Sequence, residues 1–372
     1  MKNFIPRAGH HYAQNRNFDE GPKDRQNVSS LSAFIRKRLI SEAEILHQVF
    51  DIYSFSAAEK FIQEVLWRTY WKGWLEMRPQ VWASYLQECD RLQEIKDQTS
   101  YKMAVSGSTK IECFDFWVRE LIGTGYLHNH ARMWFASIWI YALNLPWQLG
   151  AEFFYRHLLD GDPASNTLSW RWVAGLQTRG KRYLASAKNI EKFSTFREPK
   201  LPPLNDQEIL EDLDLNPSSL ILSASTKVLD GAQTLLIHSE DLIPELSEIR
   251  DFKPKRIVSV SLRGLGLSDH FDSKVLDFDE VALKDAAQRA HIAFGVKVEP
   301  LNSIDELGKE PSLCLGVALG PVQERLKALP NLHFVWRKWD QELYPMARAG
   351  FFNFKKKLES YDIQGLCADS IK

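Results

Sequence analysis

The sequence has no pair of closely spaced cysteines. Its four cysteines stand far apart and none belongs to a CxxC motif, so zinc or iron–sulfur ligation has no support. The apolar segment 135–145 is too short for a membrane span and contains Asn144. The first residues, MKNFIPRAGHHYAQNR, include no signal-peptide core. We therefore expect reduced thiols, no membrane partner and a cytoplasmic protein.

The chain also has little net charge. A formal charge of −1 gives by itself no reason to expect a nucleic-acid partner. The charge is uneven, however: residues 1–200 hold 27 Lys and Arg against 21 Asp and Glu, a balance of +6, and residues 201–372 have a balance of −7. The basic half is where a phosphate backbone is expected to bind. Its candidate contacts are Arg36, Lys37, Arg38, Arg179, Lys181 and Arg182.

Apolar residues recur at helical spacing through the first half of the chain. Residues 1–27 are polar and read as an extended arm, and residues 28–196 read as an all-α domain. Asp162 is a good N-cap and Pro163 suits the first helical position, so a helix is expected from Pro163 to about Ala174. The other expected helices are 59–76, 112–122, 127–143 and 147–159.

The second half has a different pattern. Residues 197–218 are rich in proline and acidic residues, which predicts a linker. Short apolar runs then alternate with helical segments at 280–293 and 321–328, so 219–360 is predicted to be a smaller α/β domain with a mostly parallel sheet. The expected strands are 220–223, 234–238, 256–262, 275–278, 296–299, 313–318 and 332–336. Gly264-Leu265-Gly266 is too weak a motif to indicate a nucleotide loop.

Three segments carry ordered motifs. Residues 124–172 contain TG-x-x-HN-x-x-RM, then DGD, then W-x-W. Residues 64–68 read EVLWR, and residues 28–32 read VSSLS. Together these motifs resemble the FAD-binding catalytic domain of the DNA photolyase/cryptochrome family over about residues 12–190. Within that family, the chain resembles the short photolyase-like proteins of bacteria that lack the N-terminal antenna domain. Val28 departs from the usual Thr of the phosphate loop.

The resemblance implies that FAD is the cofactor. Serine hydroxyls and the Arg68 guanidinium suit a pyrophosphate. Simpler roles stay open: Ser29 or Ser32 could cap a helix, Asp162 could be only a cap, and Asp160 a surface charge. By resemblance Asp160 pairs with Arg132. The implied FAD-binding residues are Tyr12, Ser29, Ser30, Leu31, Ser32, Arg68, Asn129, Arg132, Asp160, Gly161, Asp162 and Asn166.

The resemblance also implies a pocket for a pyrimidine dimer. Trp67, Trp71 and Trp74 lie on one helical stripe, and such a stripe is by default core packing. By resemblance Trp67 and Trp172 are the aromatic walls, and Asn129 and Met133 are the residues typical of enzymes for cyclobutane dimers. The implied substrate-binding residues are Glu64, Trp67, Trp71, Asn129, Met133 and Trp172.

Catalysis is expected to need four residues. By resemblance Glu64 stabilises the dimer radical anion, Asn166 faces the flavin N5, and Trp170 and Trp147 begin an electron-transfer chain. Plain core packing remains the alternative for both tryptophans. The third member of the chain is not evident, and Trp139, Trp117 and Tyr101 are weak candidates.

The function implied is light-driven repair of cyclobutane pyrimidine dimers. Single-stranded DNA is the expected preferred partner, because the basic charge is modest and flipping a dimer from a duplex is costly. A monomer is expected. The alternatives are a cryptochrome-like blue-light photoreceptor without repair activity and a DNA-binding or structural protein that has lost flavin. Whether the α/β domain binds an antenna chromophore is left open, as is a purely structural or partner-binding role.

Overall fold

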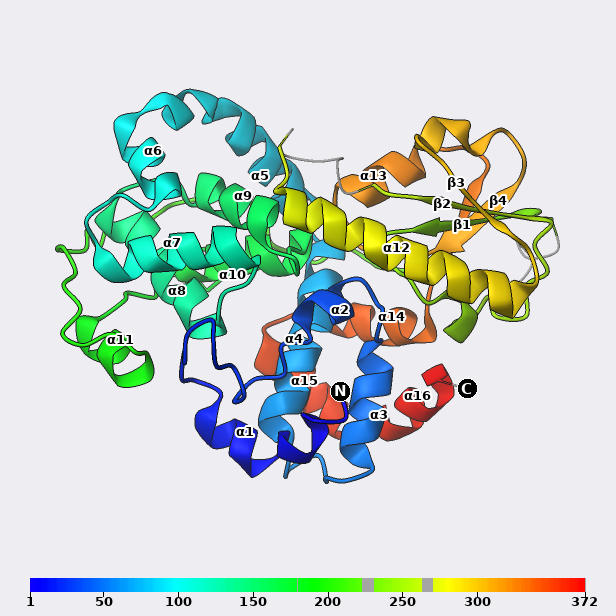
Figure 1. Cartoon of the computed structure of the whole chain (residues 1–372), viewed down its shortest axis with the longest axis horizontal. Coiled ribbons are helices and arrows are strands. Elements are labelled where there is room, and N and C mark those ends of the chain that lie inside the picture. The colour runs from blue at the N-terminus through cyan, green and yellow to red at the C-terminus, as the bar shows by residue number, and fades with distance from the viewer. Residues whose placement is uncertain (179, 223–230, 263–269, 372) are drawn as a thin grey trace.

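Helices form the first half of the molecule (Figure 1). The computed structural model describes residues 1–178, 180–222, 231–262 and 270–371. Apolar side chains from nearly all of the early helices pack into one large core. The helical elements are η1 (Ile5–Arg7), α1 (His10–Asn15), α2 (Ser32–Arg36), α3 (Glu42–Phe50), α4 (Glu59–Glu76), α5 (Pro79–Arg91), η2 (Gln93–Asp97), α6 (Thr99–Ser106), α7 (Glu112–Thr124), α8 (Asn129–Ser137), the π-helical turn η3 (Ile138–Ala142), α9 (Trp147–His157), α10 (Pro163–Val173) and α11 (Ala187–Phe193).

Helix α4 is the central element of this half. Its bounds match the predicted 59–76, and eleven of its residues are buried. A Cβ atom on Gly73 would lie 2.6 Å from the Tyr344 backbone, so the C-terminal part of the chain approaches α4 closely at this position. Among the described residues, no helix is both long and apolar enough to cross a membrane.

A five-stranded parallel sheet is the centre of the second half of the molecule. Its order is β3-β2-β1-β4-β5, and every pairing is parallel. Helix α12 (Ser273–Phe294) covers one face and α13 (Pro321–Lys327) the other, which explains the uninterrupted burial of β1. The strands are β1 (Thr234–His238), β2 (Arg256–Val260), β3 (Val298–Pro300), β4 (Ser312–Leu315) and β5 (Leu332–Val335), and the short helices η5 (Pro244–Leu246) and η6 (Ile304–Leu307) lie between them.

Two of the predicted strands are not present. The run 275–278 lies inside α12, because Asp272 caps that helix and the buried Val275, Asp279 and Ala282 follow helical spacing. A helical period sustained over 22 residues outweighs four apolar residues in a row. Residues 220–222 form no strand, and Ser223 lies outside the described residues. The other five predicted strands overlap β1 to β5.

The N-terminal segment 1–27 is not an extended arm. It contains η1 and α1, and Phe4, Ile5, Ala8 and Tyr12 are buried in the helical core. Four apolar side chains on one side of a polar segment are enough to fix it on the core. The sequence prediction missed them because it used the average polarity of the segment.

The chain after β5 returns to the helical half. The returning elements are α14 (Lys338–Leu343), η7 (Tyr344–Met346), α15 (Phe351–Glu359) and α16 (Ile363–Ile371). Trp339 Nε1 donates to Thr69 Oγ1 of α4 at 3.1 Å. By packing, the α/β part therefore ends near β5 rather than at residue 360, and the two termini lie on the same side of the molecule (Figure 1). Residues 197–218 form neither helix nor strand, but Leu201 and Leu204 pack on the helical core.

Buried ion pairs join the two halves at the carboxyl edge of the sheet. Lys37 Nζ lies 2.7 Å from Asp279 of α12, and both side chains are fully buried. Arg38 contacts Asp340 through both terminal nitrogens, and Arg36 donates to Glu240 at 2.9 Å. The prediction that residues 36–38 bind DNA is therefore wrong, because they neutralise acidic residues of the second half.

Candidate functional site

Arg132 and Asp160 form a two-pronged ion pair. Arg132 lies on α8, and Asp160 lies in the turn between α9 and α10. The guanidinium nitrogens lie 3.0 and 2.8 Å from the two carboxylate oxygens. Burial alone would raise the pKa of Asp160, but the charge and hydrogen bonds of Arg132 outweigh it and lower the pKa. The pair expected from the sequence is thus present, and Asp160 is not a surface charge.

Asp162 combines the two roles that the sequence left open. Its Oδ1 accepts from the Ser165 backbone N–H at 2.8 Å, so it caps α10. Its Oδ2 faces three cations at 3.5 to 3.8 Å: Arg36, Lys72 and Arg68. Burial raises the pKa of Asp162, but Lys72, Arg36 and Arg68 lower it further than burial raises it. Asp162 is therefore a carboxylate held in a cationic cluster.

The serine loop lines a pocket together with other predicted site residues. Ser30 has a φ of 53°, a left-handed conformation that residues other than glycine seldom adopt. The predicted residues in the lining are Tyr12, Ser29, Ser30, Leu31, Ser32, Glu64 and Asn129. Sequence reasoning missed Arg16, Asn17, Val28 and Tyr126 as lining residues. Only Tyr126, inside the TG-x-x-HN motif, and Val28, in the serine motif, had a usable signal.

His128 also borders this pocket, and its ring is used locally. Its Nε2 lies 3.1 Å from the Arg16 carbonyl, and its Nδ1 accepts from the His130 N–H. Burial lowers the pKa of His128 to about 4. The ring is therefore neutral near pH 7, which argues for a positioning role.

Glu64 is the acidic group of the pocket wall. It lies on α4 and forms an ion pair with Arg16. Burial raises the pKa of Glu64, although the Arg16 charge opposes the increase. Burial and the Glu64 charge together raise the pKa of the neighbouring Tyr12 phenol. The site thus contains a carboxyl group that holds a proton more readily than an exposed glutamate.

The donor set fits a phosphate-bearing flavin. Arg68 Nη1 is buried, lies 3.8 Å from Asp162 Oδ2 and makes no hydrogen bond, while Nη2 reaches the Ser32 carbonyl at 3.4 Å. A buried guanidinium N–H without a partner is costly, so an anion is its natural ligand. The Ser32 side chain also hydrogen-bonds Asp160, which connects the serine loop to the DGD turn. Serine hydroxyls, Arg68 and the Arg132–Asp160 pair would hold the cofactor.

Asn166 lies on α10 beyond Asp162. Its Nδ2 donates to the Ala151 carbonyl of α9 at 2.7 Å. This bond fixes the amide, so that Oδ1 remains as the acceptor. The neighbouring Gly161 carbonyl accepts from Arg36 Nε at 2.9 Å, which holds the DGD turn in place.

The expected aromatic walls of a dimer pocket are not brought face to face. The Trp67 ring stacks on Phe351 of α15 at 3.6 Å and lies 5.1 Å from Trp71. The Trp172 ring stacks on Tyr183 at 5.6 Å. Among the described residues no ring contact joins Trp67 to Trp172. Asn129 is exposed at the pocket and Met133 is half-buried.

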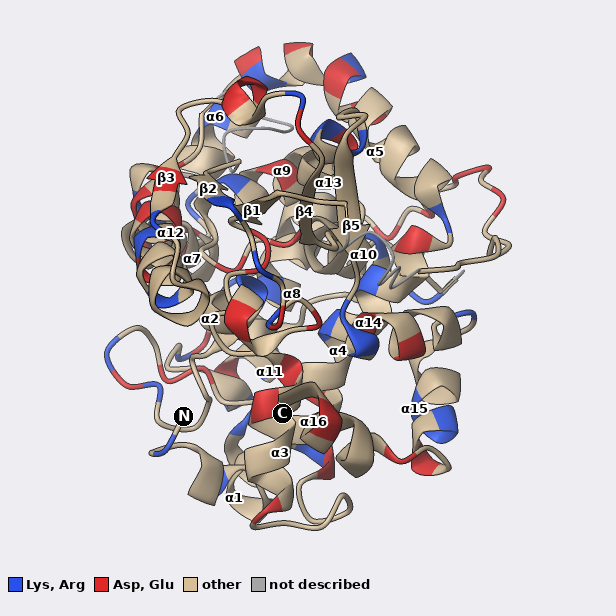
Figure 2. Cartoon of the chain, turned by 90° about the vertical axis from the view of Figure 1, so that its right-hand side faces the viewer, with Lys and Arg blue, Asp and Glu red and all other residues tan. Residues whose placement is uncertain are grey.

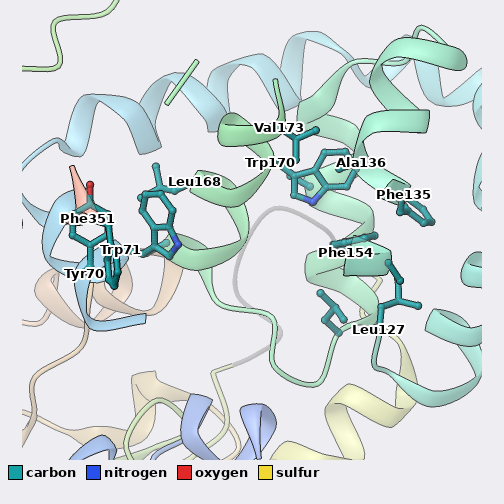
Figure 3. Close-up of a cluster of buried hydrophobic side chains, with 14 of the residues drawn as sticks. Tyr70, Trp71, Leu127, Phe135, Ala136, Phe154, Leu168, Trp170, Val173 and Phe351 are labelled. Carbon is teal, nitrogen blue, oxygen red and sulfur yellow. The ribbon is translucent and has the colours of Figure 1, made fainter. Parts of the chain in front are cut away.

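The two tryptophans expected to carry electrons lie against the same helix. The Trp170 ring packs on α9 at Gly150, where a Cβ atom would come within 2.3 Å of it. Gly150 follows Trp147 by one helical turn. Figure 3 shows Trp170 among Phe154, Phe135 and Ala136, and the Phe154 ring lies 5.0 Å from it. Three residues were weak candidates for the third member of the electron-transfer chain. The Trp139 ring centroid lies 6.2 Å from that of Trp170, and the Tyr101 ring centroid lies 5.8 Å from that of Trp139. Trp117 stacks instead on Trp134.

Few of the proposed phosphate contacts are free on the surface. Lys181 is exposed, whereas Arg182 pairs with Asp206 at 2.9 Å. Arg179 and the Gly264-Leu265-Gly266 segment lie outside the described residues. Figure 2 shows Lys and Arg interspersed with Asp and Glu on the face that it presents.

Comparison with known proteins finds relatives of the helical half. Residues 61–199 match the family model described as the FAD-binding domain of DNA photolyase. A deoxyribodipyrimidine photo-lyase of Alkalihalophilus pseudofirmus is 28% identical over 190 residues, which is 48% of this chain and 39% of the relative. One of Streptomyces griseus is 34% identical over 153 residues, which is 41% of this chain and 33% of the relative. The chain thus spans well under half of these relatives.

Solved structures show a partial likeness. A bacterial class III photolyase from Agrobacterium tumefaciens has 28% identity and a TM-score of 0.44, and the match covers 52% of this chain and 40% of that one. Arg68 and the Arg132–Asp160 pair lie within the residues that the family model matches. Residues 61–199 are therefore similar to the FAD-binding domain of DNA photolyase, and this likeness indicates FAD as the cofactor.

Proposed function

We propose that this chain is a light-driven, FAD-dependent enzyme that reverses cyclobutane pyrimidine dimers in DNA. The observation that carries the proposal is Glu64. Its carboxyl is half-buried, has a raised pKa and is oriented by Arg16 in the pocket that also holds the serine loop and Asn129. A group with these properties can share a proton with a base that gains negative charge. Relatives of the helical half are named deoxyribodipyrimidine photo-lyase, which supports the same reaction.

The residues of the chain have separate tasks in this mechanism. Reduced FAD, when bound, supplies the electron that light releases, and the protein supplies orientation and electrostatics. Arg68 and the serine hydroxyls hold its phosphates. Asn166, fixed by the Ala151 carbonyl, offers an acceptor to a protonated ring nitrogen. Glu64 hydrogen-bonds the reduced dimer and returns the proton when the dimer has split. Trp170 and Trp147 re-reduce the cofactor.

We further propose that single-stranded DNA is the preferred substrate and that the protein is a cytoplasmic monomer. The preference is supported by burial, because Arg36, Lys37 and Arg38 are removed from the positive surface that a duplex would need. All four cysteines are free and buried thiols, which suits a reducing compartment.

A cryptochrome-like photoreceptor is the second candidate, and one observation favours it. Phe351 covers a face of Trp67, and Tyr183 covers a face of Trp172, so both expected walls of the dimer pocket already have aromatic partners. A photoreceptor has no need of open walls. For repair, Phe351 or Tyr183 must move away from its tryptophan, or the dimer must bind to the uncovered faces of Trp67 and Trp172.

A repair assay separates the two candidates. Flavin absorption of the purified protein is measured first, and ultraviolet-treated oligothymidine is then illuminated with protein whose flavin is chemically reduced. We expect dimers to disappear under blue light and to persist in the dark. A flavin-loaded, fully reduced protein that leaves the dimers intact would contradict repair and favour the photoreceptor. Phe351→Ala tests the cover on Trp67, because it should raise the repair rate only if Phe351 has to move.

A further inference from the structure

The outer neighbour of Trp147 is a tyrosine. The ring of Tyr85, on α5, stacks on Trp147 with a centroid distance of 5.5 Å and an interplanar angle of 19°. Tyr85 is 2% exposed and Trp147 is 3% exposed. Beyond it Trp82 lies 5.4 Å away. This stacked pair occupies the outer end of the path on which the sequence provided no third tryptophan.

The path from Trp170 to Trp147 is short. The Trp170 ring rests on the α9 backbone at Gly150, and three residues of helix advance about 4.5 Å along the axis. Trp147 also lies near the residue that follows Trp170, because the Arg171 guanidinium is 5.9 Å from the Trp147 ring centroid. The Trp170 ring and Trp147 therefore lie one helical turn apart along α9, and Tyr85 of α5 stacks on Trp147.

Glu152 supplies the proton acceptor that an oxidised phenol needs. A tyrosine that loses an electron also loses its hydroxyl proton, so a buried tyrosine can serve as a donor only beside a base. Glu152, on α9, is fully buried, and its negative charge acts on Tyr85. Lys96, which is 25% exposed, reaches the Glu152 oxygens at 2.8 and 2.9 Å and connects them to the surface.

The Tyr85 hydroxyl has one close polar neighbour, the Cys89 thiol, with which it shares a hydrogen bond. Its oxygen is buried and makes no stronger hydrogen bond among the described residues. Burial, with the Cys89 thiol and the Glu152 carboxylate, raises the pKa of Tyr85. A phenylalanine would stack equally well on Trp147 without the cost of burying a hydroxyl. A thiol is a weak hydrogen-bond partner, so a hydroxyl buried beside one calls for a functional reason.

Fixed charges favour movement of the oxidising equivalent towards Tyr85. Arg171 places a positive charge near Trp147, although Glu211 pairs with it. Glu152 places a negative charge near Tyr85. Positive charge disfavours an oxidised Trp147, and negative charge favours loss of an electron and a proton from Tyr85.

We propose that Tyr85 is the terminal electron donor of the chain Trp170–Trp147–Tyr85, with Glu152 accepting its proton. The inference rests on the proposed flavin photochemistry. With oxidised FAD bound and illuminated, Trp170 would give up an electron, Trp147 would re-reduce Trp170, and Tyr85 would re-reduce Trp147. The Tyr85 O–H bond would break, the proton would form an O–H bond on Glu152, and a neutral tyrosyl radical would remain. An external thiolate would then return one electron to Tyr85 and become a thiyl radical, while Glu152 returns the proton.

A second route for the electron, through Trp139, ends at a tyrosine that is less suited to oxidation. Trp139 contacts Trp170 at 6.2 Å, and Tyr101 contacts Trp139 at 5.8 Å. The Tyr101 hydroxyl, however, accepts a hydrogen bond from Arg156. The Glu152 charge acts on both phenols, but only Tyr101 has a cation at its hydroxyl, which opposes loss of an electron. Tyr101→Phe is therefore the matched control for Tyr85→Phe.

The test identifies the radical. Flavin-loaded protein is illuminated without external reductant and frozen, and its electron paramagnetic resonance spectrum is recorded with ordinary and ring-deuterated tyrosine. We expect a tyrosyl signal in the native protein and in Tyr101→Phe, its replacement by a short-lived tryptophanyl signal in Tyr85→Phe, and slower tyrosyl formation in Glu152→Gln. In flavin-free protein, ultraviolet flash oxidation of tryptophan should yield less tyrosyl radical in Tyr85→Phe than in the native chain.

Each outcome decides the inference. A native protein that photoreduces its flavin but shows only tryptophanyl radical, or a tyrosyl signal that survives Tyr85→Phe and disappears in Tyr101→Phe, would overturn the assignment. A native protein that shows no flavin photoreduction would contradict the proposed photochemistry instead. In that case the flavin-free flash experiment still tests the Trp147–Tyr85 step, so the two failures are distinguishable.

Discussion

The Lys37 ammonium lies 2.7 Å from the Asp279 carboxylate, and neither side chain is exposed to solvent. The two residues are 242 positions apart and connect the helical half to the helix that covers the sheet. With Arg36 and Arg38 nearby, the basic run seals the carboxyl edge of β1, where ligands of open α/β sheets commonly bind. The opposite charges of the two halves therefore serve, in part, to hold them together.

Breaking this pair should destabilise the whole protein. Lys37→Met leaves Asp279 buried without its close partner, and loss of one member of a buried pair costs about 3–5 kcal/mol. Unfolding in urea should therefore begin at a clearly lower concentration than in the native chain. Lys284→Met is the control, because it removes an exposed pair with Glu280 on the same helix and should change little. Equal midpoints for the two variants would contradict a structural role for Lys37.

Trp170→Phe should separate photoreduction from repair. The substitution keeps an aromatic ring over Gly150 but removes the most easily oxidised side chain next to Phe154. We expect light-driven reduction of oxidised flavin to be lost, while repair by chemically pre-reduced protein stays nearly unchanged. Both are measured on one preparation, by flavin absorption and by dimer loss. Retention of both activities would mean that Trp170 is only a packing residue.

Glu64→Ala should lower the number of dimers repaired per absorbed photon without loss of flavin. The carboxyl that shares a proton with the reduced dimer is removed, and Arg16 loses its ion pair. Glu64→Gln keeps the shape and a hydrogen bond but cannot return a proton, so it should lie between the alanine variant and the native enzyme. An unchanged quantum yield in both variants would remove Glu64 from the mechanism.

Glu120 should make stability fall as the pH rises. Burial and the Asp19 charge raise the pKa of Glu120 to about 7, although Arg25 opposes them. A carboxyl with a raised pKa binds more protons in the folded state, so its contribution is complete below about pH 4.5 and is lost as pH passes 7. Glu120→Gln should flatten the dependence of the unfolding midpoint between these values. A variant with the native pH profile would show that Glu120 ionises normally.

Local patterns were predicted well and long-range packing was not. The bounds of α4 and the cap of α10 follow from apolar spacing and from Asp162 followed by Pro163, which are properties of neighbouring residues. The fate of residues 36–38 depends on carboxylates more than two hundred positions away, and charge counting cannot distinguish a surface cluster from a buried network.

The site was predictable to the same extent. The motifs indicated Arg132 with Asp160, and the pair is present. The ring partners of Trp67 and Trp147 come from other helices, Phe351 and Tyr85, with no motif of their own, and only the fold brings them together. The strand predicted at 256–262 was found, although β2 ends at Val260, because a parallel strand buried on both faces reads as an apolar run.

Single-stranded DNA should be repaired faster than duplex DNA. In a duplex the dimer must leave the stack, which costs a few kcal/mol before any contact is made. A broad basic surface would offset that cost, but Arg36, Lys37 and Arg38 are buried in ion pairs and Arg182 is paired with Asp206. In a single strand little has to be unpaired, and stacking on aromatic rings can supply the binding energy. The assay compares one dimer-containing oligonucleotide alone and annealed, at the same low salt. Equal rates would mean that the chain has a basic surface for duplex DNA elsewhere. A steeper loss of activity with added salt on duplex than on single strands would point to the same conclusion, because each phosphate contact adds to the salt dependence.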